Sequence, residues 1–182
     1  MNIDNQMMLP MSPAAAWALL MQIPATAACF PGASDIVEVD ASHFTGKVTV
    51  KLGPLTMLFN GRIHIQERDD DKYQATIQAQ WSEAKGRGNA NTITKFHLQD
   101  QNQSTQVIIH SDIQLAGQIA QYGRGVGMIN SISEQLIRSF ASNIAAHMND
   151  PELAQSNTAI SGIGLMAKVI GQQLRRWNHL QT

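Results

Sequence analysis

Six histidines and a run of aspartates are the side chains of this sequence that could hold a metal ion or transfer protons. No two histidines stand four positions apart, the spacing that places two imidazole ligands on one face of a helix. The run Asp69–Asp71 lacks the spaced oxygen ligands of a calcium loop and has the composition of a solvated hairpin turn. We therefore expect no metal site and ordinary surface histidines, namely His43, His64, His97, His110, His147 and His179.

Three further features resemble parts of reactive sites. Cys29 follows an apolar helix and has no adjacent cation to lower its pKa, so a small buried thiol is expected. The glycine-rich stretch 123–127 lacks the Lys-Ser/Thr of a phosphate loop, and its glycines suit a strand-to-helix turn. Arg124 beside that turn is a candidate partner for a carboxylate or a ligand head group. Glu67 and Arg62 either orient the polar end of a ligand or occupy exposed strand positions.

The elements that position these residues follow from the hydrophobic pattern. From residue 34 to 115 its period is two, which predicts an antiparallel meander of six strands with one buried face. Met57, Phe59, Ile63 and Ile65, for example, fall on one side of a predicted strand. Turn-forming residues separate the strands at 53–54, 69–71, 83–86 and 100–104.

One strand and two short helices are predicted before the meander. The strand spans about residues 2–9. Ser12 is a good N-cap and Pro13 suits a first helical turn, so a helix should start there. Pro24 ends this helix and opens a second one, which stops at residues 31–32.

A long helix is predicted after the meander. Beyond Gly117 the period returns to 3.6, and the helix should start near residue 120 or 126 and end at Met148. At 1.5 Å per residue such a helix is about 35 Å long. Because only a large curved sheet can cover it, we predict an α+β fold. In this fold a strongly curved antiparallel sheet of about seven strands surrounds the long C-terminal helix.

A bent sheet that closes over one helix leaves space between them, since the two surfaces curve differently. Apolar side chains would line such a space, as in most small-molecule sites. The alternative is that the same side chains fill a solid core. The predicted lining residues are Phe59, Ile63, Ile65, Trp81, Phe96 and Ile109 from the sheet and Ile129, Ile132 and Leu136 from the helix.

Composition narrows the class of protein. The chain has 182 residues, with 13 Lys and Arg against 14 Asp and Glu, and a net charge of −1. A dedicated nucleic-acid binder would need a basic stripe. One cysteine allows no internal disulfide. No signal pattern begins the chain, and its longest apolar stretch, 14–21, is far shorter than the roughly 20 residues that cross a bilayer. We expect a soluble cytoplasmic protein.

Several motifs match a known family in order along the chain. They are Trp17, Leu20, Ile23-Pro24, residues 29–32 (CFPG), residues 46–54 (GKVTVKLGP), Phe59, Gly61, Glu67, residues 86–90 (GRGNA), residues 105–107 (TQV) and residues 115–125 (LAGQIAQYGRG). Over roughly residues 1–148 this pattern resembles the carbon monoxide dehydrogenase G-subunit family (CoxG).

The resemblance implies a helix-grip fold, shared with the START and plant-allergen-like superfamily, and it raises the expectation of an apolar cavity. It also implies an association with molybdenum-containing carbon monoxide dehydrogenases and related hydroxylases. Members are thought to bring the soluble enzyme to the cytoplasmic membrane, where electrons enter the quinone pool. No catalytic residue defines the family, so the resemblance assigns none to this chain.

A separate segment is predicted after the helix-grip domain of residues 1–148. Residues 149–158 have the composition of a linker, and residues 159–182 form an amphipathic helical candidate without acidic residues. These features are typical of a helix on an anionic membrane surface. The alternative is a helix that docks on its own domain or pairs with a second copy. The predicted contact residues are Ile163, Met166, Lys168, Ile170, Leu174, Arg175, Arg176 and Trp177.

Two functions are therefore considered. The first is a non-catalytic accessory protein that binds a quinone- or lipid-like molecule and helps to recruit a molybdenum hydroxylase or carbon monoxide dehydrogenase to the inner face of the cytoplasmic membrane. A homodimer fits this function too, and neither a covalent cofactor nor nucleic acid is expected. The second is a helix-grip cyclase, aromatase or hydrolase with a hydrophobic substrate. It requires titratable groups in the cavity, and the inward strand faces offer few besides Tyr73 and Glu67.

Overall fold

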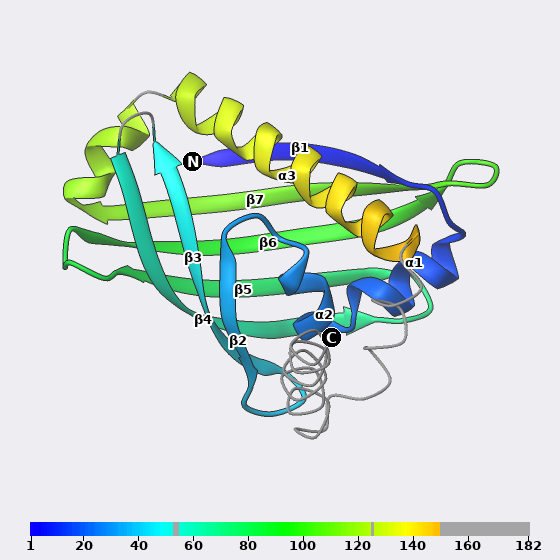
Figure 1. Cartoon of the computed structure of the whole chain (residues 1–182). Helices are drawn as coiled ribbons and strands as arrows, with labels where there is room; N and C mark the ends of the chain where they lie inside the picture. The colour runs from blue at the N-terminus through cyan, green and yellow to red at the C-terminus, as the bar shows by residue number, and fades with distance from the viewer. Residues whose placement is uncertain (53–54, 125, 150–182) are drawn as a thin grey trace, which may run out of the picture. The chain divides into compact units, whose positions relative to one another are not determined.

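A computed structural model describes residues 1–52, 55–124 and 126–149 of the 182-residue chain. Residues 1–146 form one compact unit. The predicted linker after Asn149 and the predicted segment 159–182 lie outside the described residues. The elements are β1 (Asn2–Leu9), α1 (Pro13–Leu20), α2 (Ile23–Ala28), β2 (Ala33–Glu38), β3 (His43–Leu52), β4 (Leu55–Asp69), β5 (Gln74–Glu83), β6 (Gly88–Asp100), β7 (Thr105–Gly117), the 3-10 helix η1 (Gln118–Arg124) and α3 (Val126–Asn149) (Figure 1).

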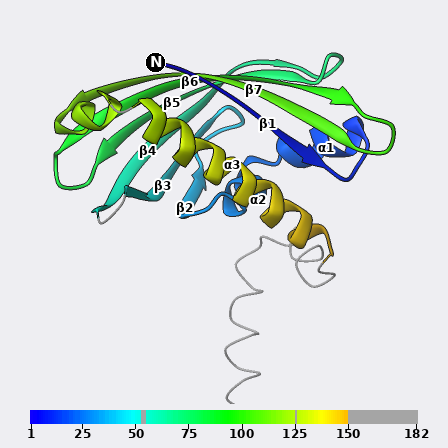
Figure 2. The ribbon, with the colours of Figure 1, turned by 90° about the horizontal axis from the view of Figure 1, so that it is seen from above.

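Seven strands form one antiparallel sheet in the order β1-β7-β6-β5-β4-β3-β2. Strands β2 to β7 pair in sequence, and β1 completes the sheet by pairing with β7, where Asn2 lies opposite Asp112. Figures 1 and 2 show the sheet bending around α3, which lies across its concave side. The predicted fold, a curved sheet around a long helix with two short helices after the first strand, is confirmed.

The two short helices start where local chemistry favours a start. The N–H of Ala15 donates a hydrogen bond to Oγ of Ser12 at 3.4 Å, and Pro13 occupies the first turn, where its missing N–H costs nothing. Helix α2 carries Pro24 in its first turn, and Cys29 is its C-cap. Helix α1 contacts β6 and α2 contacts β2, so both helices pack on the sheet.

The strand alternation places one face of the sheet in the interior. Met57, Phe59 and Gly61 of β4 are buried, and Ile63 and Ile65 further along the strand are half-buried. The buried apolar side chains form two separate clusters, one around α1 and α3 and one next to η1. Two separate clusters mean that the interior is not filled continuously from end to end. The most deeply buried side chains are Leu9, Met57, Thr105, Val107 and Ile144.

An aromatic cluster fixes α1 against the turn between β4 and β5. The ring of Trp17 lies 5.9 Å from the rings of both Tyr73 and Phe96, measured between centroids. Its indole N–H donates to Asp70 Oδ1 at 2.6 Å, and Arg68 Nε donates to the same oxygen at 2.8 Å. These two hydrogen bonds, that of Trp17 above all, hold the pKa of the Asp70 carboxyl below its usual range. The predicted aspartate turn therefore also anchors α1 to the sheet.

Candidate ligand-binding cavities

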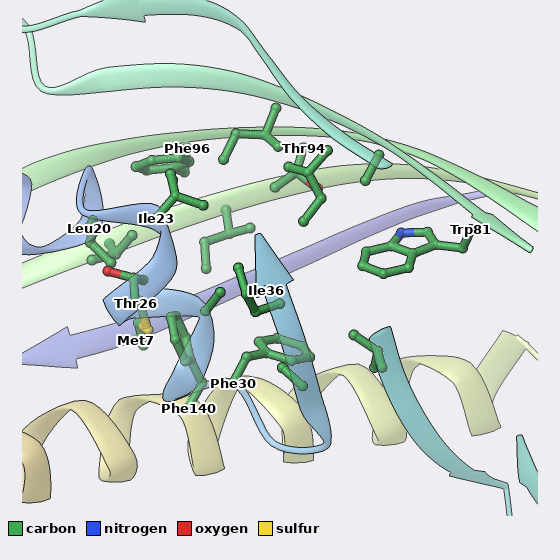
Figure 3. A pocket seen from close by; sticks show the side chains of 18 residues that line it. Met7, Leu20, Ile23, Thr26, Phe30, Ile36, Trp81, Thr94, Phe96 and Phe140 are labelled. Carbon is green, nitrogen blue, oxygen red and sulfur yellow. The ribbon is translucent and has the colours of Figure 1, made fainter. Parts of the chain in front are cut away.

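Two apolar cavities lie between the concave face of the sheet and α3. The first has a volume of about 280 Å³, and α2 and β2 contribute Ile23 and Ile36 to its wall (Figure 3). The second has a volume of about 290 Å³, and Met57 of β4 and Ile119 of η1 contribute to it. The space between sheet and helix is therefore hollow rather than a solid core.

The described lining of both cavities contains no carboxylate, ammonium, guanidinium, imidazole or thiol group. Apart from the indole N–H of Trp81, its polar side-chain groups are hydroxyls that already have partners. Thr26 Oγ1 donates to the Leu19 carbonyl (2.6 Å), Thr92 Oγ1 to the Ala79 carbonyl (3.5 Å), Thr94 Oγ1 pairs with Ser111 Oγ (3.0 Å), and Ser133 Oγ accepts from Asn5 Nδ2 (2.6 Å). Such walls suit an apolar ligand and offer no group for acid–base chemistry.

Eight of the nine predicted cavity residues line these spaces. Ile63, Trp81, Phe96 and Ile109 line the first cavity. The second is lined by Phe59, Trp81, Ile129, Ile132 and Leu136. Trp81 belongs to both linings, and the strand and helix patterns therefore converge on the same interior space.

Ile65 and Glu67 lie elsewhere. Ile65 is half-buried but lines neither cavity. A β-bulge in β4 falls between Ile65 and Glu67 and moves Glu67 to the other face of the sheet. There Glu67 is exposed and accepts a hydrogen bond from Thr76 Oγ1 at 2.9 Å. The expectation of an inward Glu67 was wrong, and Tyr73, which packs on Trp17, lines neither cavity.

Other lining residues were not predicted from the sequence, and three of them show why. Phe30 follows α2 in an irregular segment, where no periodicity shows its direction. Val48 of β3 alternates with polar residues and could have been recognised as inward-facing. Phe140 lies on the apolar stripe of α3, and its ring centroid is 5.6 Å from that of Phe30. Figure 3 shows Phe30 and Phe140 close together above α3.

The two cavities meet at a shared wall. Phe30, Val48 and Trp81 line both of them, and they come from three different parts of the chain. In Figure 3 the indole of Trp81 points into the first cavity toward Ile36 and Phe30. Gly61 lies opposite Trp81 in the β4–β5 register, and a Cβ there would overlap the indole ring. The absence of a side chain at Gly61 thus allows the indole to lie against the sheet between the cavities.

A buried ion pair stands apart from the cavities, at the turn between β5 and β6. Glu83 is only 4% exposed. Its carboxylate accepts hydrogen bonds from Arg87 Nη2 at 2.7 Å and from the backbone N–H groups of Arg87 and Lys85 at 3.1 and 2.8 Å. These interactions, led by the Arg87 side chain, lower the pKa of Glu83 to about 2. The sequence showed only a turn here, because the alternation ends at this residue.

The remaining titratable residues are dispersed. The rings of His43 and His64 stack at a centroid distance of 4.3 Å. His110 Nδ1 lies 2.7 Å from Asp4 Oδ1 on the outer face. Within the described ranges, no group of three or more His, Cys, Asp or Glu side chains is arranged to hold a metal ion. Cys29 is buried, and burial raises the pKa of its thiol.

Some predicted sites receive no structural description. The side chain of Arg124 is one of them, while Arg62 is exposed on the outer face of β4. In the part of the chain that the structure covers, no helix has the length and hydropathy needed to cross a membrane. The predicted membrane or partner contacts outside the described residues are Ile163, Met166, Lys168, Ile170, Leu174, Arg175, Arg176 and Trp177.

The curved sheet closed by one long helix over apolar cavities defines a helix-grip protein. The profile of the CoxG family, the G-subunit family of carbon monoxide dehydrogenase, matches residues 6–149. The chain belongs to this family.

Solved structures share the fold at low sequence identity. A conserved protein from Geobacillus kaustophilus has a TM-score of 0.70 at 16% identity, covering 86% of this chain and 97% of its own. The Zhui aromatase/cyclase from a Streptomyces species has a TM-score of 0.57 at 10% identity, covering 89% and 98%. A START superfamily protein from Mycobacterium smegmatis has a TM-score of 0.56 at 9% identity, covering 80% and 95%. No curated protein matches the sequence.

Proposed function

We propose that this protein is a non-catalytic accessory protein that holds a neutral, quinone- or lipid-like molecule in its interior. The observation that carries the proposal is the lack of ionisable side chains in the described lining of both cavities. An apolar ligand gains free energy by burial there, at roughly 25 cal/mol per Å² of apolar surface. A charged ligand group would lose its hydration without a partner of opposite charge.

The cavity volumes limit the size of the ligand. An apolar protein cavity of roughly 150 Å³ is large enough for benzene. Cavities of about 280 and 290 Å³ are each nearly twice that size. By this comparison each holds about ten non-hydrogen atoms. One neutral molecule that spans both cavities would have about twenty.

We further propose that the protein helps to recruit a molybdenum hydroxylase or carbon monoxide dehydrogenase to the inner face of the cytoplasmic membrane. Membership in the CoxG family supports this partner. The basic, apolar pattern of residues 159–182 supports a reversible contact with anionic lipid. A cytoplasmic protein that is peripheral on the membrane follows from the same proposal.

The alternative function is that of an enzyme on a hydrophobic substrate, since one structural neighbour is an aromatase/cyclase. Such an enzyme needs a proton donor or acceptor within hydrogen-bond distance of its substrate. None of the described side chains that line the cavities supplies an ionisable one. This favours binding over catalysis.

Native mass spectrometry of the gently purified full chain, before and after extraction of small molecules, tests the proposed binding function. We expect a bound lipophilic mass of several hundred daltons that extraction removes. The variant Ala90→Phe fills part of the second cavity and should lose the adduct, whereas Asn91→Phe, exposed on the same strand, should keep it. A wild-type chain that stays ligand-free, even after incubation with quinones and neutral lipids, would overturn the proposal.

A further inference from the structure

We propose that Trp81 divides the interior into two compartments and selects a neutral ligand that carries a hydrogen-bond acceptor between two apolar parts. This inference rests on the proposed binding function and adds to it a residue and a ligand class. It joins two observations, namely the position of Trp81 in both linings and the state of its indole N–H.

The first observation is the position of the indole. Of the three residues common to both cavities, Trp81 has the largest side chain, and it is half-buried. Because a Cβ on Gly61 would overlap its ring, the sheet has room for the indole only while residue 61 is glycine. A ligand longer than one compartment must therefore pass beside this ring, with one part on each side.

The second observation is the indole N–H. It has no hydrogen-bond partner among the described residues, whereas Trp17, whose indole is also inside the domain, donates to Asp70 at 2.6 Å. Nor is this nitrogen sealed from solvent-sized space, since the fully buried, unpaired atoms of the described chain are others. Tryptophan N–H groups in apolar surroundings usually find an acceptor. The Trp81 N–H is thus available to an atom of the ligand.

The acceptor that fits is an uncharged oxygen. The hydroxyls of both linings are already hydrogen-bonded within the protein, so the Trp81 N–H is the side-chain donor that remains in the described lining. A carboxylate or phosphate at this place would be buried without a cation. A ketone, ether or quinone-type carbonyl accepts the hydrogen bond without that cost. The ligand class is therefore a neutral ketone-like molecule with about ten non-hydrogen atoms on each side of its oxygen.

Two isomeric ketones test the inference on the full chain. In 1-phenyloctan-1-one the carbonyl lies between the ring and the alkyl chain, and in 8-phenyloctan-2-one it lies near the far end of the chain. Their composition is identical, so a difference in affinity reports the position of the oxygen. We expect the wild-type protein to bind 1-phenyloctan-1-one about five- to tenfold more tightly, as one additional hydrogen bond would give. In Trp81→Phe, which keeps a ring but lacks the N–H, the preference should fall below about twofold.

The outcomes separate the two proposals. If the wild-type protein binds neither ketone, the proposed binding function fails. If it binds both equally, or if Trp81→Phe keeps the preference, the cavity function stands and the role of Trp81 is overturned. A spectrum of the ¹⁵N-labelled wild-type protein gives the same answer without a variant. The indole N–H resonance of Trp81 should move downfield with 1-phenyloctan-1-one, and an unmoved resonance in the bound protein contradicts the inference.

Discussion

Gly61 and Trp81 face each other across β4 and β5, and the indole of Trp81 occupies the space that a side chain on Gly61 would need. The pair combines the smallest residue with the largest on one row of the sheet. Because Trp81 lines both cavities, the identity of residue 61 sets where their common wall stands.

The substitution Gly61→Ala should therefore displace the indole of Trp81. Overpacking of this kind costs about 1–3 kcal/mol of unfolding free energy. Urea unfolding followed by circular dichroism measures the loss. In a Trp81→Ala background the ring is gone, and the same Gly61→Ala change should cost little. An equal loss in both backgrounds would show that the two residues do not interact.

Glu83 predicts a pH dependence of stability. Its pKa is about 2 in the folded protein, against an ordinary value of 4.5, because Arg87 and backbone N–H groups hold the charged form. A lowered folded-state pKa gives a contribution that is complete above about pH 4.5 and is lost as the pH falls toward about 2. Wild type should thus be more stable than Glu83→Gln at pH 7, with the gap narrowing through this interval. Thermal unfolding at several pH values measures it, and a constant gap would refute the explanation.

Trp17→Phe isolates the indole hydrogen bond that anchors α1. The ring stays, while the N–H that donates to Asp70 is lost. Hydrogen bonds to charged groups contribute about 1.5–3 kcal/mol, so a destabilisation of that order is expected in urea unfolding. The variant Asp70→Asn serves as a partner in a double-mutant cycle. Additive effects of the two changes would mean that this hydrogen bond adds no stability.

Cys29 should react slowly in the native protein. Its thiol is buried, and burial raises its pKa, so little thiolate is present at neutral pH. We expect labelling by a thiol reagent such as Ellman's reagent to be more than about tenfold slower in the folded chain than in urea. Rapid native labelling would show that the segment after α2 opens readily.

The fold could be predicted from the sequence because its elements are long and their periods are clear. The alternation of β4 identified Phe59 and Ile63 as inward-facing, and the 3.6-residue stripe of α3 identified Ile132. Periodicity shows the direction of a side chain but not the distance to the next one. Small residues such as Ala79 and Ala90 in the sheet leave room opposite α3, and the cavities depend on that room.

The misplaced residues have local causes. The bulge after Ile65 reverses the faces of β4, and a β-bulge leaves no mark in a hydrophobic pattern, so Glu67 was assigned to the wrong side. Phe30 lies between α2 and β2, where the backbone repeats no regular angle. Glu83 ends its strand with an inward carboxylate, which only the Arg87 side chain and the turn backbone make acceptable.

The pairing of β1 with β7 has a consequence for synthesis on the ribosome. Ile3 pairs with Ser111, so the first strand has no neighbour in the sheet until more than a hundred further residues have been made. At roughly 5–20 residues per second, this wait is on the order of ten seconds. The residues of α3 that wall the second cavity emerge later still. Any hydrophobic cargo can therefore be enclosed only after translation of the whole domain, and a nascent chain stopped before β7 has no vessel to fill.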